Sequence, residues 1–167
     1  KKRINGITFI HMLYGAVSNL RANVEEVNNL NVFPIPDGDT GDNMLATIIG
    51  GVEATTEENE SLAHVSRNIA NEMLLSARGN SGVIISQFFN GIAEGFKDIE
   101  EADVEQMGKA FKMGVMYAYN AVMNPTEGTI LTVANDATEY ACDQNAETAE
   151  AFLSRFFSGT KKSLKRT

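Results

Sequence analysis

The densest group of potential metal ligands lies in residues 36–43, where the carboxylates of Asp37, Asp39 and Asp42 stand close together in a glycine-containing turn. Hard divalent cations bind oxygen ligands, and Mg²⁺ usually takes one or two carboxylates and leaves its other positions to phosphates and water. A Ca²⁺ loop would need a closing Glu that this segment lacks. The pattern favours Mg²⁺, and an aspartate-rich turn that caps a helix is the alternative.

A second polar segment, residues 77–82, reads Ala-Arg-Gly-Asn-Ser-Gly. Gly79 and Gly82 let the backbone approach a ligand closely, and Asn80 and Ser81 supply polar groups beside them. The segment is similar to a phosphate-binding turn that enters an apolar helix. It lacks the Lys of a P-loop, so a plain turn between helices explains it equally well.

A third polar segment, residues 124–129, ends at Thr129. By itself it indicates only a capped turn. All three segments stand directly before a predicted helix, and a helix N-terminus presents unpaired N–H groups and the positive end of its dipole. Such ends bind phosphate, so three of them at one end of a bundle would form a nucleotide site.

Other residues with chemical potential have simpler interpretations. His11 and His64 each fall in an amphipathic segment without a second His or Cys at ligand spacing. Surface positions are therefore expected for both. Cys142 is the single cysteine, stands in a predicted helix and is expected to be a small core residue.

The elements that position these segments are predicted to be helices. Apolar residues recur every three or four positions along most of the chain, and no segment alternates like a strand for a useful length. The predicted helices cover about 7–30, 42–53, 61–77, 80–96, 103–122, 129–144 and 148 onward, with Asp39 or Thr40, Ser61, Asp103 and Thr148 as N-caps. We therefore expect an all-α fold of about seven helices in up-and-down antiparallel order.

The composition limits the class of protein. The chain has 167 residues, the size of one domain, and a net charge of −8. Nucleic-acid binding is not expected, because a phosphate backbone needs a basic face. One cysteine fits a reducing cytoplasm, and the apolar runs are too short for insertion into a membrane.

Taken together, the three segments resemble a known family. Residues 31–44 (Asn-Val-Phe-Pro-Ile-Pro-Asp-Gly-Asp-Thr-Gly-Asp-Asn-Met), 77–84 and 127–131 (Glu-Gly-Thr-Ile-Leu) are similar, in order and spacing, to the N-terminal domain of the fatty acid kinase A subunit. That domain is homologous to the L subunit of dihydroxyacetone kinases. The resemblance implies a nucleotide-binding barrel of eight antiparallel helices, of which this chain, residues 1–167, is expected to hold a fragment without the last helix and the downstream domains.

The resemblance also implies roles for individual residues. Asp37 and Asp39 would hold one or two Mg²⁺ ions that bridge the ATP phosphates, with Asp42 a weaker candidate ligand. Asn31 is the counterpart nearest to the third acidic ligand of the dihydroxyacetone kinases. The residues expected to contact the nucleotide are Asn43, Gly79, Asn80, Ser81, Gly82 and Thr129.

By the same resemblance, the acceptor is a fatty acid carboxylate presented by a separate fatty-acid-binding B subunit of the DegV-like family. The product is an acyl phosphate for phospholipid synthesis, with no covalent enzyme nucleophile. The full-length protein can also be a homodimer. Two alternatives stay open: an L-type subunit that phosphorylates a triose on a partner, and a non-catalytic helical interaction module.

Overall fold

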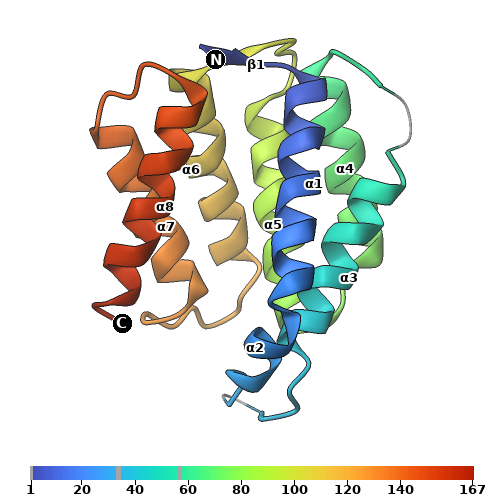
Figure 1. Cartoon of the computed structure of the whole chain (residues 1–167), viewed down its shortest axis with the longest axis vertical. Helices are drawn as coiled ribbons and strands as arrows, with labels where there is room; N and C mark the ends of the chain where they lie inside the picture. The colour runs from blue at the N-terminus through green and yellow to red at the C-terminus, as the bar shows by residue number, and fades with distance from the viewer. Residues whose placement is uncertain (1, 33–34, 56–57) are drawn as a thin grey trace.

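The computed structural model describes residues 2–32, 35–55 and 58–167, which form a bundle of eight α-helices with one short pair of strands (Figure 1). In chain order the elements are β1 (Arg3–Ile4), α1 (Gly6–Ala22), α2 (Val24–Asn29), α3 (Thr40–Glu53), α4 (Leu62–Ser76), α5 (Gly79–Gly95), β2 (Ala102–Asp103), α6 (Val104–Asn120), α7 (Ile130–Asp143) and α8 (Ala149–Leu164). From α3 to α8 each helix packs against the next and runs the opposite way. The predicted all-α, up-and-down architecture is confirmed.

The prediction of seven helices was one too few, because the segment 7–30 is two helices that meet at Asn23. This residue leaves the helical conformation, with φ −117° and ψ 11°. Its side-chain Nδ2 donates to the carbonyl of Asn19 at 2.8 Å, while its backbone N–H donates to Leu20 O at 3.1 Å. An asparagine amide that bonds its own helix competes with the regular ladder. The chain therefore turns here, and α2 forms a separate element.

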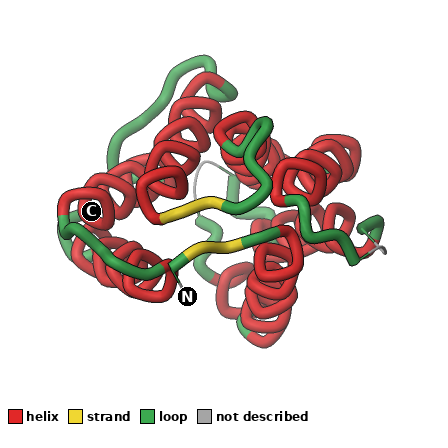
Figure 2. Tube along the Cα trace, turned by 90° about the horizontal axis from the view of Figure 1, so that it is seen from above, coloured by secondary structure: helices red, strands yellow, loops and turns green. Residues whose placement is uncertain are grey.

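A short antiparallel pair of strands was also not predicted. β1 pairs with β2 so that Arg3 lies opposite Asp103 and Ile4 opposite Ala102. Seen from above, the two strands lie side by side across the ends of the helices (Figure 2). Ile4 and Ala102 are buried. The pair therefore closes one end of the core.

The core takes apolar side chains from α1 and from α3 to α8. Where α5, α6 and α8 meet, the ring of Phe111 contacts the rings of Phe88, Phe152 and Phe156 edge-on, with centroids 5.9, 5.2 and 5.3 Å away. Edge-to-face contacts of this kind add to the free energy gained from burial. They tie α8 to α5 through α6.

Helices α5 and α6 approach at backbone contact. A Cβ added to Gly91 would lie 2.6 Å from Gly114 Cα, and one added to Gly95 would lie 2.5 Å from Ala110 Cα. Only glycine leaves room for such an approach. The contact holds α5, whose N-terminus carries one of the predicted phosphate turns, firmly against the centre of the bundle.

Cap residues were predicted well. Ser61, Asp103 and Thr148 each accept a hydrogen bond from a backbone N–H in the first turn of their helices, and Asp103 forms a capping box with Gln106. Asp39 differs, because it stands at the N-cap of α3 without a side-chain cap bond. Its carboxylate is thus not used by the helix that follows it.

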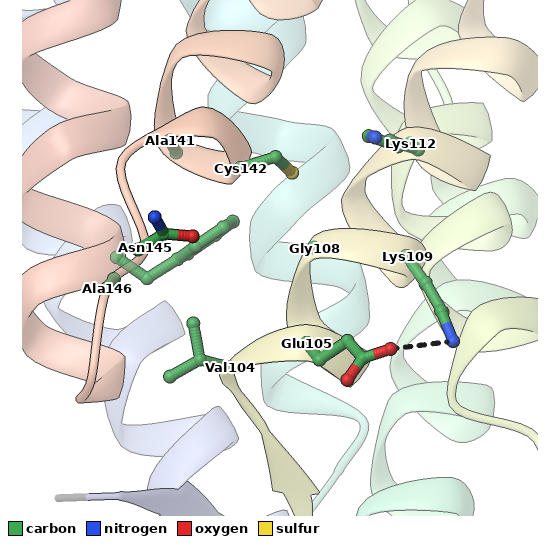
Figure 3. Close-up of a pocket in the computed structure, with 10 residues that line it drawn as sticks. Val104, Glu105, Gly108, Lys109, Lys112, Ala141, Cys142, Asn145 and Ala146 are labelled. Carbon is green, nitrogen blue, oxygen red and sulfur yellow. Dashed lines mark ion pairs between the residues drawn. The ribbon is translucent and has the colours of Figure 1, made fainter.

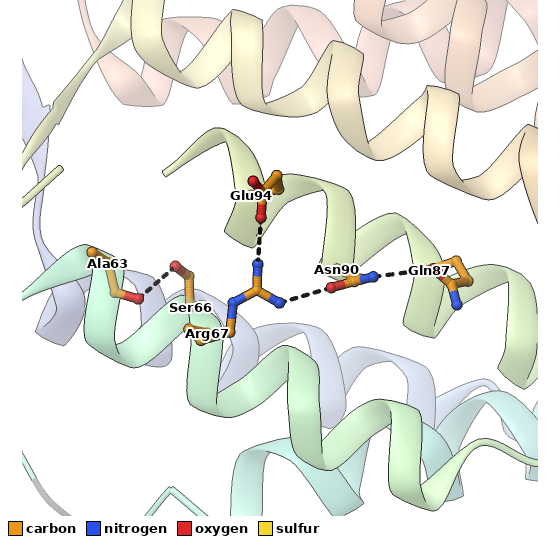
Figure 4. A network of polar contacts seen from close by, with 6 residues as sticks. All are labelled: Ala63, Ser66, Arg67, Gln87, Asn90 and Glu94. Carbon is orange, nitrogen blue, oxygen red and sulfur yellow. Dashed lines mark hydrogen bonds and ion pairs between the residues drawn. The ribbon is translucent and has the colours of Figure 1, made fainter. Parts of the chain in front are cut away.

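The outer face between α4 and α5 carries a polar network (Figure 4). Arg67 on α4 donates to Asn90 Oδ1 at 2.8 Å and to Glu94 Oε2 at 3.1 Å, and Asn90 Nδ2 donates to Gln87 Oε1 at 3.2 Å. Partly exposed ion pairs contribute little free energy. The network instead orients α4 along α5.

Within the described ranges, none of the helices has both the length and the apolar character that a membrane crossing requires.

Candidate functional site

The three polar segments lie at one end of the bundle, opposite the strand pair. The N-termini of α3, α5 and α7 all point to this end (Figure 1). Each segment contains one glycine in the left-handed region: Gly38 with φ 66°, Gly79 with φ 65° and Gly128 with φ 78°. These are the glycines with positive φ in the described part of the chain. Each predicted loop therefore turns sharply into a helix whose first N–H groups face the same end.

Residues 36–43, which we call the acidic loop, and the Gly-Asn-Ser-Gly turn at residues 79–82 are in direct contact through Thr47. This residue is fully buried; its Oγ1 donates to Asn43 O at 2.7 Å and accepts from the backbone N–H of Arg78 at 3.2 Å. The hydroxyl of Ser81 also donates, at 3.4 Å, to the carbonyl of Thr40. The N-termini of α3 and α5 are thus bonded directly to each other.

The glycines of the second segment allow this contact. A Cβ on Gly79 would lie 2.6 Å from Asn43 Nδ2, and a Cβ on Gly82 would lie 2.5 Å from Thr47 Oγ1. The structure brings together Asn43, Gly79 and Gly82, three of the residues that are predicted to contact the nucleotide. Asn80 is exposed, and the residue at the N-cap, Arg78, makes no side-chain cap bond, so the first N–H groups of α5 stay available to a ligand.

The aspartates of the first segment differ in their surroundings. Asp42 accepts a hydrogen bond from the side chain of Asn28 at 3.1 Å, whereas the carboxylates of Asp37 and Asp39 have no bonding partner among the described residues. Asn31, the predicted third ligand, accepts from the backbone N–H of Asp39 at 3.3 Å. In the described part of the chain, no three acidic, His or Cys side chains stand close enough together to hold a metal ion. The carboxylates of Asp37 and Asp39, which have no described partner, are oxygen donors of the chemical type that Mg²⁺ prefers.

The third segment has its own network, and no bond among the described residues joins it to the other two. Thr129 caps α7, and its hydroxyl donates to Thr126 O at 2.8 Å. Glu127 accepts from Thr132 Oγ1 at 2.6 Å and from Tyr119 at 3.4 Å. Burial, and then the charge of Glu127, raises the pKa of Tyr119. These bonds link the loop to α6 and α7 at the same end of the bundle as the acidic loop.

A known protein family matches most of this chain. The profile of the DAK2 domain family matches residues 34–167, a range that includes the three polar segments from the aspartates onward. The chain belongs to the DAK2 domain family. DAK2 domains are kinase-associated nucleotide-binding modules, found as a subunit of dihydroxyacetone kinase.

Several curated relatives of this DAK2 domain are staphylococcal. An uncharacterized protein of Staphylococcus epidermidis (strain ATCC 12228) is 40% identical over 168 residues, which are 99% of this chain and 30% of that protein. Uncharacterized proteins of Staphylococcus haemolyticus and Staphylococcus aureus (strain USA300) are 43% and 40% identical over 87% and 89% of the chain, and over 27% of their own lengths. The chain thus spans less than a third of these relatives.

A separate cavity of about 440 Å³ lies at the opposite end of the DAK2 domain, between α6 and the turn from α7 to α8 (Figure 3). Cys142 lines it with its sulfur turned toward α6. The residue is half-buried and packs against the hydrophobic core, so the predicted core position is only partly correct. Burial raises the pKa of Cys142, and the nearby charge of Lys112 lowers it by less.

His11 and His64 are exposed, as predicted. None of these residues belongs to the three-loop site.

Two residues that connect the loops to each other and to α2, Thr47 and Asn28, were not predicted from the sequence. Thr47 lies one turn beyond Asn43 in the same helix, and Asn28 lies 14 positions before its partner Asp42. A buried threonine among the apolar residues of a helix is a weak signal for the first. Nothing in the spacing indicates the second, because it depends on how α2 folds back onto α3.

Proposed function

We propose that this DAK2 domain binds Mg²⁺ and ATP at the end of the bundle formed by the N-termini of α3, α5 and α7. The observation that carries the proposal is the repeated geometry: Gly38, Gly79 and Gly128 each take a left-handed conformation beside a helix start at that end. Helix N-termini attract phosphate through free N–H groups and the helix dipole. A nucleotide with three phosphates suits such a set.

Within this site, some residues would bind the metal ion and others the phosphate groups. Asp37 and Asp39 would hold Mg²⁺, because their carboxylates are unpaired in the described structure. The bound ion would neutralise phosphate charge during transfer. Asn43, Asn80 and Ser81, with the backbone N–H of Gly79, would donate hydrogen bonds to phosphate oxygens. The N–H of Gly82 already donates to Arg78 O at 3.0 Å, so Gly82 would serve by leaving room for the close approach of α5 to Thr47. Thr129 would lie beside the nucleotide. The net charge of −8 fits a site in which metal ions supply much of the positive charge.

We further propose that the acceptor is a fatty acid carboxylate. A carboxylate oxygen would attack the γ-phosphorus, the bond from that phosphorus to the β,γ-bridging oxygen would break, and ADP would leave with its electron pair. The product is an acyl phosphate, which would enter phospholipid synthesis. The motif of residues 31–36 and the Glu-Gly-Thr-Ile-Leu block at 127–131 support this acceptor over a triose. A separate fatty-acid-binding subunit of the DegV-like family would present it.

Calorimetric titration tests the nucleotide site. The chain is titrated with a non-hydrolysable ATP analogue with and without Mg²⁺, and Asp37→Asn and Asp39→Asn are compared with a control, Asp143→Asn, on the exposed far end of α7. We expect Mg²⁺-dependent binding in the wild type and the control, and much weaker binding with a higher Mg²⁺ requirement in the two loop variants. Mg²⁺ binding that is indifferent to nucleotide would favour the interaction module.

The acceptor is tested separately, with the full-length protein that contains this domain. Phosphoryl transfer from ATP is measured with a DegV-like subunit loaded with fatty acid and with a dihydroxyacetone-binding subunit. We expect acyl phosphate only with the first. Transfer to the triose would instead assign the domain to the dihydroxyacetone branch.

A further inference from the structure

The short helix α2 lies against the first turn of α3, beside the acidic loop. Gly41 is buried at this contact, and a Cβ there would lie 2.6 Å from Val24 O and 2.9 Å from Asn28 Oδ1. No larger residue would fit without moving α2. The separation of α2 from α1 at Asn23 thus brings a second asparagine, Asn28, to the start of α3.

Asn28 and Asp42 form a reciprocal pair that we call the α2–α3 clasp. The backbone N–H of Asp42 donates to Asn28 Oδ1 at 3.1 Å, and Asn28 Nδ2 donates to Asp42 Oδ2 at 3.1 Å. A backbone N–H can only donate and a carboxylate can only accept, so the two bonds fix which way the amide of Asn28 points. The clasp satisfies one free N–H at the start of α3 and holds one oxygen of Asp42.

The other end of the acidic loop is held in the same manner. Asn31 Oδ1 accepts from the backbone N–H of Asp39 at 3.3 Å, and Asn31 Nδ2 donates to Ile35 O at 3.2 Å. Asn28 therefore bonds the backbone after the Asp-Gly-Asp turn, and Asn31 bonds the backbone before the turn and at its last residue. The carboxylates left without a described partner are those of Asp37 and Asp39.

We propose that Asp42 is an anchor of this loop and not a metal ligand, and that Asn28 is a positioning residue that acts through it. The clasp holds the first turn of α3 so that Asp37, Asp39 and the free N–H groups of the helix face the bound Mg²⁺ and nucleotide together. This inference rests on the proposed nucleotide site. It assigns to α2 a role in shaping that site.

Exchanging the two side chains tests the clasp. Asp42→Asn keeps an acceptor for Asn28 Nδ2, so affinity for the Mg²⁺-bound ATP analogue should stay within about threefold of wild type. Asn28→Asp places two carboxylates in contact, which should weaken binding about tenfold, the equivalent of one charged hydrogen bond. In the double variant the new amide at position 42 can donate to the new carboxylate at position 28. Binding should therefore return to within about threefold of wild type.

Three readouts separate the outcomes. The Mg²⁺ concentration that gives half-maximal analogue binding should be unchanged in Asp42→Asn and raised in Asp37→Asn. A matching rise in Asp42→Asn would show that Asp42 ligates the metal and would overturn the proposal, as would failure of the double variant to recover. If the wild type binds no analogue, the proposed function fails, and the role of Asn28 in it fails too. The double-mutant cycle in the free energy of unfolding then still shows whether the clasp exists.

Discussion

The contact between the acidic loop and the second loop depends on one buried hydroxyl, and Thr47→Val removes it without changing the side chain's shape. Thr47 is fully buried, and its Oγ1 accepts from the N–H of Arg78 and donates to Asn43 O. The Asn43 carbonyl belongs to the helix ladder and keeps that bond. The Arg78 N–H instead loses its partner, which costs about 1–2 kcal/mol.

Urea unfolding monitored by circular dichroism measures this cost, with Thr138→Val as the matched control. Thr138 is equally buried on α7, but its hydroxyl bonds only the helix carbonyl of Ala134, at 2.8 Å. We expect the control to lose less than about 0.5 kcal/mol and Thr47→Val to lose about 1–2 kcal/mol more stability than that, a fall in Tm of roughly 2–8 °C. Equal losses in the two variants would refute the reasoning that Thr47 joins the loops.

Other predictions concern packing, capping and pH. Gly91→Val should lower the free energy of unfolding, measured with urea, by about 1–3 kcal/mol, because the valine side chain would press on the backbone of Gly114. An unchanged urea midpoint would contradict the close contact of α5 and α6. Asp103→Ala should lower the free energy of unfolding in the same assay by about 1 kcal/mol, because the capping box is lost. An unchanged free energy of unfolding would mean that the box is not formed. Burial raises the pKa of Cys142 and Lys112 lowers it by less, so the pH midpoint of its alkylation by iodoacetamide should exceed that of the unfolded chain and rise again in Lys112→Ala. Because the folded state disfavours the thiolate, the stability that this thiol contributes is present below its unfolded pKa and is lost as pH rises through the folded pKa. An alkylation midpoint below that of the unfolded chain would show that folding lowers the pKa of Cys142 and would contradict this prediction.

Much of the fold follows from local signals. Helices α4, α6 and α8 begin within a residue or two of their predicted starts, because Ser61, Asp103 and Thr148 are strong N-caps before regular apolar repeats. The break at Asn23 could not be predicted, since the apolar repeat continues across it and only the side-chain bond to Asn19 reveals it. The two-residue strands are too short to show any period.

The candidate site was predictable in its loops and not in its connections. Glycines and aspartates at residues 36–43, and glycines, Asn80 and Ser81 at residues 77–82, mark the loops by their types alone. The contacts of Thr47 with Arg78 and of Asn28 with Asp42 join residues 31 and 14 positions apart, and depend on how α3 meets its neighbours. Tertiary contacts of single polar atoms leave no periodic trace in a sequence.

The most direct test of the nucleotide site is amide chemical-shift mapping of the isotope-labelled chain during titration with a Mg²⁺-bound, non-hydrolysable ATP analogue, which also detects weak binding. The three-loop site predicts that the largest shifts fall on the amides of residues 38–43, 79–82 and 128–131, and that they diminish without Mg²⁺. Shifts concentrated instead around Cys142 and Lys112 at the opposite end, or no shifts at saturating analogue, would contradict it.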